Sequence, residues 1–403
     1  MIQEKNWHKF PVLFSLYIAQ SIPMSFFSTV VPVIMRQGNY SLGSIGLLQL
    51  TKLPWILKFL WAPIIDNKTK TTHQLRSWII ISELFYAIVI LCIGMFNLQT
   101  DFKLIIILMV LAFLVSATQD IAVDIFAILS LKPSERGIGN SMQSAGSFMG
   151  TFLGTGVLLI AYHYFGWSNL LFLLAAFVAF ALVPLMLYRK PIPIERTKKP
   201  RVTLRDIYLF LFEKGRHKHI LILVFFYAGS IGILTMLKPF LVDLGYNIKE
   251  IALMSGLFGT SIAALSAFSG GFIIKKIGRI KSMYIFLSLS FLAATTFWFI
   301  SHSVPSVAVL YLAIGLLWSS YGFSTVAIYT ISMDKVRVGR EGTDFTIQIV
   351  LTHLSSLIIA VLSGKIGDLI GYTGLFGIEV LLCLFTFVIL FYGLPKYKEN
   401  GNI

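Results

Sequence analysis

Two aspartates stand in a stretch where an apolar helix is expected. Asp120 and Asp124 occur in "ATQDIAVD", inside an apolar run that begins at Leu104 and meets no further charge before Lys132. Because they are four residues apart, they lie on one helix face about one turn from each other. A buried carboxyl group beside a second one can bind and release a proton, and the two then titrate as a coupled pair. We therefore expect Asp120 and Asp124 to couple a function to protons.

The composition places these acids in a membrane protein. Of the 403 residues, 57% are hydrophobic and 13% are charged, and the mean hydropathy is +0.82. Apolar runs of at least ~18 residues are typical of membrane-spanning helices, because lipid offers the backbone no hydrogen-bond partners. We predict twelve such helices, at residues 10–35, 41–65, 77–98, 104–131, 137–164, 168–188, 219–241, 250–274, 282–300, 306–333, 344–370 and 374–394.

The basic residues predict the orientation of the chain. If both termini are cytoplasmic, 26 of the 33 Lys and Arg residues fall in cytoplasmic segments, as the positive-inside rule requires. The net charge of +15 is dispersed over these short segments, so we expect no nucleic-acid partner. A basic cytoplasmic linker, residues 189–218, separates a half at 1–188 from a half at 219–403. Within the linker, "TLRDIYLFLFE" predicts a short amphipathic helix on the inner membrane surface.

The two predicted halves resemble each other in sequence. Pro32 and Pro239 each precede a glycine by six residues, and Gln143 and Gln348 end the matching stretches "RGIGNSMQ" and "EGTDFTIQ". The offsets between these pairs are close to half the chain. Internal repeats of membrane helices, with a binding site at the midplane between them, are the architecture of secondary transporters.

A structural ion pair is the alternative for the two acids. A charge at the bilayer centre costs ~2.5–3.5 kcal/mol on insertion scales, so both acids must face protein or water. Lys52 and Lys58, on the second predicted span, lie at a matching depth. We expect Lys58 to pair with Asp124, and we expect Asp120, nearer to the middle of the membrane, to be functional.

Other polar side chains within the spans are candidates for lining a substrate cavity. They are Gln20, Gln119, Gln143, Lys238, Gln348 and His353. The amides either bind substrate or join helices, Lys238 either attracts an anionic group or extends to the outer headgroups, and His353 either relays protons or is structural. Glu83 and Glu379 are expected near helix ends. Cys92 and Cys383 fall inside spans, which argues against a disulfide.

Several short motifs resemble a known family. "WAPIIDNKTK" and "GGFIIKKIGRIK" are similar to the loop motif of the major facilitator superfamily, although Ala62 replaces a glycine in the first and Lys275 replaces an acid in the second. "LPWILKFLWAPIID", "ATQDIAVDIFAI" and "GNSMQSAGSFMGTFLGTG" resemble the branch that contains muropeptide permeases, acetyl-CoA transporters and siderophore permeases of the pyochelin and rhizobactin type. "EGTDFTIQ", which contains Asp344, is most similar to the siderophore group.

The resemblance implies an all-α membrane protein of the major facilitator fold, with twelve transmembrane helices in two six-helix halves. In that superfamily the loop motif clasps neighbouring helices when the outer gate is open, so Asp66 is expected to act as a latch. An ordinary helix end is the alternative. Asp344 joins Lys52, Lys58 and Asp66 as an expected ion-pair or gating residue. The resemblance also implies a monomeric, proton-coupled importer in the inner membrane.

These observations leave three functional hypotheses. The first is a permease for an amphipathic or aromatic organic solute, most consistent with a ferric siderophore, and the second is a permease for a muropeptide or related cell-wall fragment. The third, a membrane-embedded transferase, is disfavoured because His163 and His353 are isolated. The chain has no phosphate-binding loop and no metal-binding motif, so we expect no enzyme activity, no catalytic residue, no metal and no cofactor.

Overall fold

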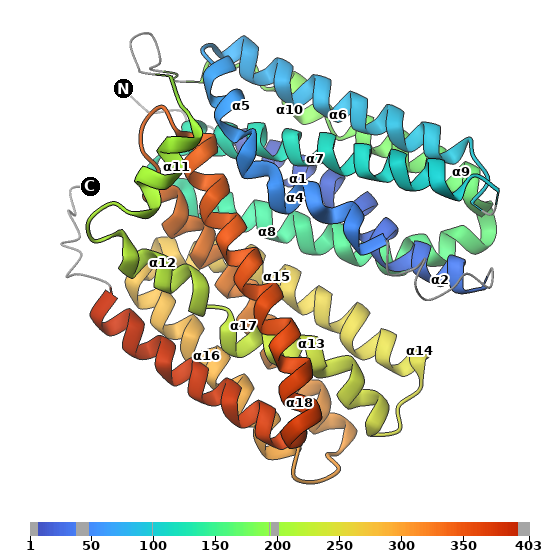
Figure 1. Ribbon diagram of the computed structural model, residues 1–403, viewed down its shortest axis with the longest axis vertical. Helices are drawn as coiled ribbons and strands as arrows, with labels where there is room; N and C mark the ends of the chain where they lie inside the picture. Colours follow the sequence, from blue (N-terminus) through green and yellow to red (C-terminus); the bar gives the residue numbers. More distant parts are fainter. Residues whose placement is uncertain (1–6, 38–47, 99, 193, 195–200, 394–403) are drawn as a thin grey trace. The chain divides into compact units, whose positions relative to one another are not determined.

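A computed structural model describes residues 7–37, 48–98, 100–192, 194 and 201–393. This range excludes both chain ends and part of the linker. It also excludes the first predicted outer loop and the start of the second predicted span. The helices, shown in Figure 1, are α1 Lys9–Ser25, α2 Val31–Gln37, α4 Leu53–Leu57, α5 Ala62–Lys68, α6 Thr72–Gly94, α7 Phe102–Ser130, α8 Arg136–Phe152, α9 Leu158–Phe180, α10 Val183–Leu187, α11 Leu204–Leu211, α12 Arg216–Phe225, α13 Ala228–Asp243, α14 Ile248–Ile251, α15 Thr260–Ile277, α16 Arg279–Ile300, α17 Val307–Asp334 and α18 Glu341–Gly393.

The apolar helices match most of the predicted spans. Within the described ranges, nine helical segments are long and apolar enough to cross a membrane, and they overlap every predicted span except 41–65. Two of them, Pro133–Leu187 and Glu341–Gly393, are long enough for two crossings each. Each contains a glycine with φ of 70°, Gly166 and Gly371, where the helix is interrupted. A Cβ strongly disfavours this backbone region, which explains why glycine occupies both positions. The count of twelve spans stays a prediction.

The second predicted span is not a continuous helix. Its described part, residues 48–68, consists of two tight 3₁₀ turns alternating with α4 and α5. Pro54 lies at the start of α4 and Pro63 at the start of α5. Because proline lacks an N–H and its ring clashes with the carbonyl four residues earlier, Pro63 prevents a regular helix through residues 58–60. The turn Lys58–Leu60 is the result.

The chain packs as two compact units. The first consists of Met1–Leu204 and Met333–Val350, and the second of Arg205–Ser332 and Leu351–Ile403. In the first unit, α6 packs between α7 and α9, and α1 packs along α8 (Figure 1). The start of α18, residues 341–350, belongs to this first unit. The functional contacts described below therefore involve residues from both ends of the sequence.

Glycines on α8 allow α1 to approach it closely. A Cβ added at Gly150 would lie 2.6 Å from the Ser21 Cβ, and one added at Gly154 would lie 2.4 Å from the Ile22 carbonyl oxygen. Gly146, one turn earlier, faces α1 in the same way. Small residues at four-residue spacing are the usual means of bringing two membrane helices into backbone contact. The "AGSFMGTFLG" stretch therefore fixes the position of α1, which carries Tyr17 and Gln20.

The second unit contains a broken helix and a close glycine contact of its own. A turn at Phe226 and Tyr227 separates α12 from α13. On α13, a Cβ added at Gly229 would lie 2.8 Å from the backbone oxygen of Glu379, which is on the last part of α18. The predicted amphipathic helix of the linker forms as α11, with Leu204, Tyr208 and Leu209 among its exposed side chains.

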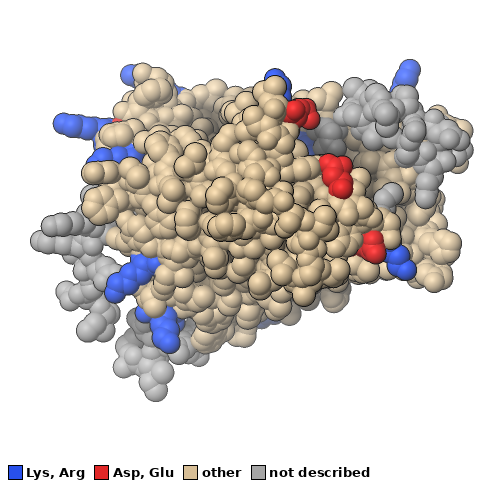
Figure 2. All heavy atoms as spheres, turned by 90° about the horizontal axis from the view of Figure 1, so that it is seen from below, with Lys and Arg blue, Asp and Glu red and all other residues tan. Residues whose placement is uncertain are grey.

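The surface is consistent with contact to lipid tails. Many large apolar side chains of the long helices are exposed, including Ile81, Phe180 and Leu265 at 65%, 71% and 66%. The face drawn in Figure 2 has a broad area without charged side chains. Such an area is unfavourable in water and favourable against hydrocarbon.

Candidate functional site

The acids of α7 lie in a buried polar cluster of the first unit. Asp120 and Asp124 are 4% and 1% exposed, and Lys58 is 1% exposed. The Lys58 ammonium forms an ion pair with Asp120. Our expectation that Lys58 pairs with Asp124 was wrong, because the 3₁₀ turn at Lys58–Leu60 gives this side chain a different depth and direction from those on a regular helix. The ring of Trp55 lies 4.9 Å from the Lys58 ammonium and adds a cation–π contact.

Asp124 has neutral partners. The Tyr17 hydroxyl donates a hydrogen bond to its carboxylate, and the Gln143 side chain is a further hydrogen-bond partner. The charges of Asp120 and Lys58 also act on Asp124. Sequence reasoning did not identify Tyr17. It lies three residues before Gln20 on α1, so a search for polar neighbours on the same helix face would have found it.

The two predicted glutamines of α1 and α7 meet each other. Gln20 donates a hydrogen bond from its amide nitrogen to the Gln119 side-chain oxygen, and both are buried, at 2% and 0% exposure. With Gln143 on α8, three of the six predicted cavity residues therefore lie on helices that also contribute to the aspartate cluster. A hydrogen bond between two amides uses groups that would otherwise be available to a substrate.

The cluster contains unequal numbers of acids and bases. Its members are two carboxyl groups, Asp120 and Asp124, and one ammonium, Lys58. Lys52, the other predicted cation, is half-buried and makes no ion pair with any described residue. If both acids are ionised, the cluster carries one net negative charge in a buried environment, and the binding of one proton makes it neutral.

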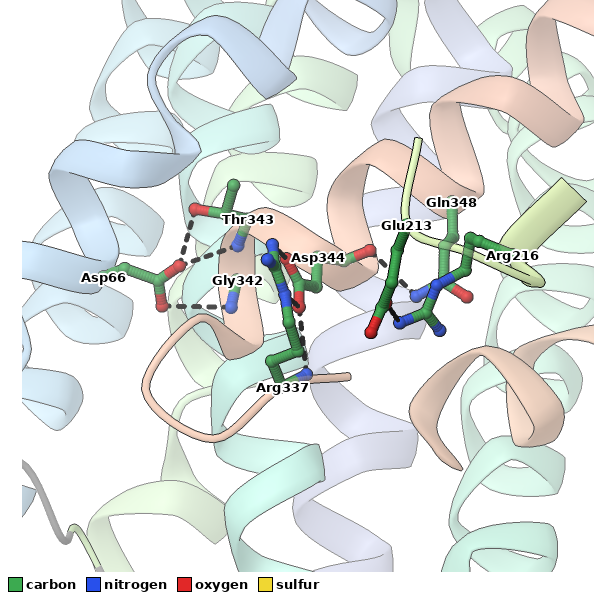
Figure 3. Close-up of polar contacts among 8 residues, drawn as sticks. All are labelled: Asp66, Glu213, Arg216, Arg337, Gly342, Thr343, Asp344 and Gln348. Carbon is green, nitrogen blue, oxygen red and sulfur yellow. Dashed lines mark hydrogen bonds and ion pairs between the residues drawn. The ribbon is translucent and has the colours of Figure 1, made fainter. Parts of the chain in front are cut away.

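Asp66 holds the beginning of α18. Its two carboxylate oxygens accept hydrogen bonds from the backbone N–H groups of Gly342, at 3.0 Å, and Thr343, at 2.7 Å, and from the Thr343 hydroxyl at 2.7 Å (Figure 3). The first N–H groups of a helix have no partner within the helix, and a negative charge there is favourable. Asp66 is 2% exposed, so these contacts replace its hydration almost completely.

Asp344, the neighbouring predicted residue, pairs with an arginine that the sequence analysis did not single out. The Arg337 side chain donates two hydrogen bonds to the Asp344 carboxylate, at 2.8 and 2.7 Å, and its backbone N–H donates a third at 2.9 Å (Figure 3). Gln348 donates from its side chain to the Asp344 carbonyl oxygen at 2.8 Å. Nearby in the chain, Asp334 accepts a hydrogen bond from Arg136 of α8 at 2.8 Å. The first turns of α18 are thus fixed by several charged contacts.

Two predicted residues belong to the second unit. Lys238, on α13, and His353, on α18, both have exposed side chains. Exposure near the end of α13 is what the snorkelling alternative for Lys238 requires. No group of three His, Cys, Asp or Glu residues in the described ranges could hold a metal ion.

Two glutamates that we expected near helix ends are deeply buried. Glu83 on α6 is 0% exposed and Glu379 on α18 is 1% exposed. Both Glu83 oxygens, and one Glu379 oxygen, accept no hydrogen bond within the described part of the chain. The expectation was wrong for Glu83, which lies at the centre of α6. Helix-end assignments from hydropathy shift by several residues, and α6 begins at Thr72 and not at residue 77.

Comparison with known proteins identifies the family. Residues 13–350 match the Major Facilitator Superfamily, and the chain belongs to it. It is 22% identical to the anhydromuropeptide permease of Escherichia coli strain K12, over 88% of this chain and 73% of that one. Two solved structures have the same fold: the outward-facing bacterial homologue of the iron transporter ferroportin, with a TM-score of 0.73 at 18% identity, and the human organic anion transporter MFSD10, with 0.74 at 14%. They cover 96% of this chain and 99% and 100% of their own lengths.

Membership of this family establishes the class of protein. The chain is an all-helical, multi-pass membrane transporter and not an enzyme. The resemblance predicted from the motifs is confirmed, including the branch that contains the muropeptide permeases.

Proposed function

We propose that this protein is a proton-coupled permease that imports an anhydromuropeptide, a sugar-peptide fragment of the cell wall, across the inner membrane. The similarity to the anhydromuropeptide permease of Escherichia coli, which extends over 88% of this chain, carries the proposal. Both termini are cytoplasmic in this proposal, as the distribution of basic residues predicts. The proposed membrane is the inner one, as the resemblance to this branch of permeases implies.

The siderophore hypothesis depended mainly on the stretch "EGTDFTIQ". In the structure, Gly342 and Thr343 of this stretch bind Asp66, and Asp344 binds Arg337. Most polar groups of the motif are engaged by other protein groups, although the buried Thr346 hydroxyl has no hydrogen-bond partner among the described residues, so most of the motif is explained without a substrate. It therefore offers little support for any particular cargo.

We propose that the aspartate cluster couples transport to protons. Lys58 holds Asp120 as an ion pair, whereas Asp124 has only neutral hydrogen-bond donors in direct contact. Asp124 is therefore the group that we expect to bind the proton that neutralises the cluster. Gln20, Gln119 and Gln143 are proposed to lie along the substrate path. Lys238 and His353, in the second unit, remain proposed substrate contacts of that unit.

Uptake measurements test both parts of this proposal. Cells lacking their own muropeptide import would express the wild type or Asp124→Asn and receive tritiated anhydromuropeptide or a radioactive ferric siderophore, with and without a protonophore. We expect the wild type to accumulate only the muropeptide and the protonophore to abolish accumulation. Asp124→Asn should exchange muropeptide across the membrane without accumulating it, because this variant keeps the Lys58–Asp120 pair and is permanently neutral at position 124.

Each other outcome has a definite meaning. Accumulation of the siderophore alone would overturn the proposed substrate and restore the first hypothesis. Uptake of neither compound by an expressed, membrane-inserted protein would overturn both. Normal protonophore-sensitive accumulation by Asp124→Asn would show that Asp124 is a structural residue.

A further inference from the structure

Glu83 occupies the middle of a membrane helix. It is the central residue of α6, Thr72–Gly94, with equal numbers of helical residues before and after it. Its side chain is completely buried, and neither carboxyl oxygen accepts a hydrogen bond from any residue that the structure describes. An ionised carboxylate at this depth has lost its water and gained no donor. The favourable state of such a group is the neutral one, with a proton bound.

Among the residues that the structure describes, no base is found to compensate the charge of Glu83. On α6 itself, Tyr86 lies one turn away, and its hydroxyl interacts with both Glu83 and Ser116 of α7. α9 contributes apolar side chains to this region of the core, including Leu171, Leu174 and Ala175. The nearest charged residue along α7 is Asp120, whose ammonium partner, Lys58, is already used.

Glu83 is connected to the proposed coupling acids by the face of α7. Ser116, Asp120 and Asp124 follow one another at four-residue spacing and are 0%, 4% and 1% exposed. At this spacing the three side chains form a single stripe along the helix. Ser116 is the end of the stripe that meets Tyr86, and the Tyr86 hydroxyl also interacts with Glu83. Like charges in an interior of low dielectric repel each other, so we expect ionisation of Glu83 and of the α7 acids to oppose each other.

We propose that Glu83 is a second proton-binding site, electrostatically coupled to Asp120 and Asp124 through the polar face of α7. A proton on the aspartate cluster removes a negative charge and thereby eases release of the proton from Glu83. Return of a proton to Glu83 eases ionisation of the cluster in the same way. This inference rests on the proposed proton coupling of transport, although the presence of a proton on Glu83 can be tested without any substrate.

Infrared spectroscopy of the purified protein in proteoliposomes tests the site directly. A protonated carboxyl group has a carbonyl stretch that is separate from that of the carboxylate and shifts in heavy water. At neutral pH we expect this band in the wild type and the loss of one of its components in Glu83→Gln. Glu379→Gln, the matched variant of a buried acid in the second unit, should keep that component and lose at most a different one. An unchanged band in Glu83→Gln would overturn the proposal. If Glu83→Gln does not fold, labelling the glutamates of Glu379→Gln with heavy carbon must shift the remaining band, and absence of a shift would equally overturn the proposal.

Transport of tritiated anhydromuropeptide supplies the functional readout. Glu83→Gln mimics the protonated form permanently, so we expect substrate exchange to remain while protonophore-sensitive accumulation is lost. The loss corresponds to the roughly fiftyfold concentration ratio that one proton supports at a potential of about 100 mV. If Glu83→Gln accumulates substrate as the wild type does, the proton on Glu83 is not exchanged during transport. If the wild type does not transport muropeptide, the proposed function fails, whereas the infrared result still decides whether Glu83 binds a proton.

Discussion

At the scale of single residues, charges in this protein are buried with partners chosen by geometry. Lys58 pairs with Asp120, Arg337 with Asp344, and Asp66 with backbone N–H groups. Glu83 is the exception in the first unit, because no described donor reaches its oxygens. Buried ion pairs add little net stability, yet removing one partner leaves the other uncompensated. The consequence can be measured at Lys58.

Lys58→Met should be strongly destabilising. It leaves Asp120 and Asp124 together without a cation, and loss of one partner of a buried pair costs about 3–5 kcal/mol. Thermal unfolding in detergent measures the effect. The double variant Lys58→Met/Asp120→Asn should recover most of the loss, because it removes both charges. Asp124→Asn is the matched control, and it should be only mildly destabilising since the ion pair remains. Equal melting temperatures for Lys58→Met and the wild type would exclude a buried pair.

At the scale of elements, the functional side chains are presented by irregular helices. Proline breaks the second span around Lys58, and π-helical segments interrupt the first and fifth spans at Phe26–Val30 and Leu153–Val157. The two π-helical segments contact each other within the first unit. π-Helical turns frequently accompany functional sites, because they redirect side chains without ending the helix. The first backbone N–H groups of α18 have no hydrogen-bond acceptor within that helix. Asp66 of α5 accepts two of them.

Asp66→Asn should weaken the attachment of α18. The amide keeps one acceptor oxygen, but it loses the second acceptor and the charge that favours a helix N-terminus, so we expect destabilisation of about 1–3 kcal/mol. Thr343→Val removes only the hydroxyl donor and should cost less, which makes it the matched control. Thermal unfolding and muropeptide uptake would be measured for both variants. Wild-type values for Asp66→Asn in both assays would contradict a latch at this position.

At the scale of the whole molecule, the chain is a multi-pass transporter whose first unit incorporates residues 333–350 from the second half of the sequence. A division of the chain at the linker, residues 189–218, would have assigned residues 333–350 to the second unit. The contacts of Asp66 with Thr343 and of Arg136 with Asp334 explain their place in the first unit, since each joins side chains that are about 200 or more residues apart. The orientation of the molecule in the membrane follows from its basic residues and can be tested separately.

Reporter fusions should show cytoplasmic termini. A fluorescent protein fused to the C-terminus is expected to fluoresce, because this reporter folds in the cytoplasm and not after export. Alkaline phosphatase fused at Ser303, in the turn after α16, should be active, since this turn is predicted to lie outside. The same enzyme fused at Lys335, in the turn after α17, should be inactive and serves as the control. The opposite pattern would invert the predicted topology.

Hydropathy and local motifs were sufficient for much of the architecture. Spans such as 104–131 and 306–333 were located closely, because lipid forces the backbone into helices wherever apolar residues continue for long enough. Motifs around Asp66 and Asp120 were sufficient to identify the superfamily to which the chain belongs. Helix breaks were less predictable, since a proline permits a break and the neighbouring helices determine its form.

The sequence by itself therefore determined that this is a helical membrane transporter, and it predicted which polar residues lie within the helices and which side of the membrane the basic residues face. Only the tertiary structure decided the partners: Lys58 with Asp120, Tyr17 with Asp124, Asp66 with the start of α18, and no donor for Glu83. Hydrophobic burial depends on composition along the chain and can be read from it. Hydrogen bonds and ion pairs depend on distances of a few ångströms between helices, which packing alone sets.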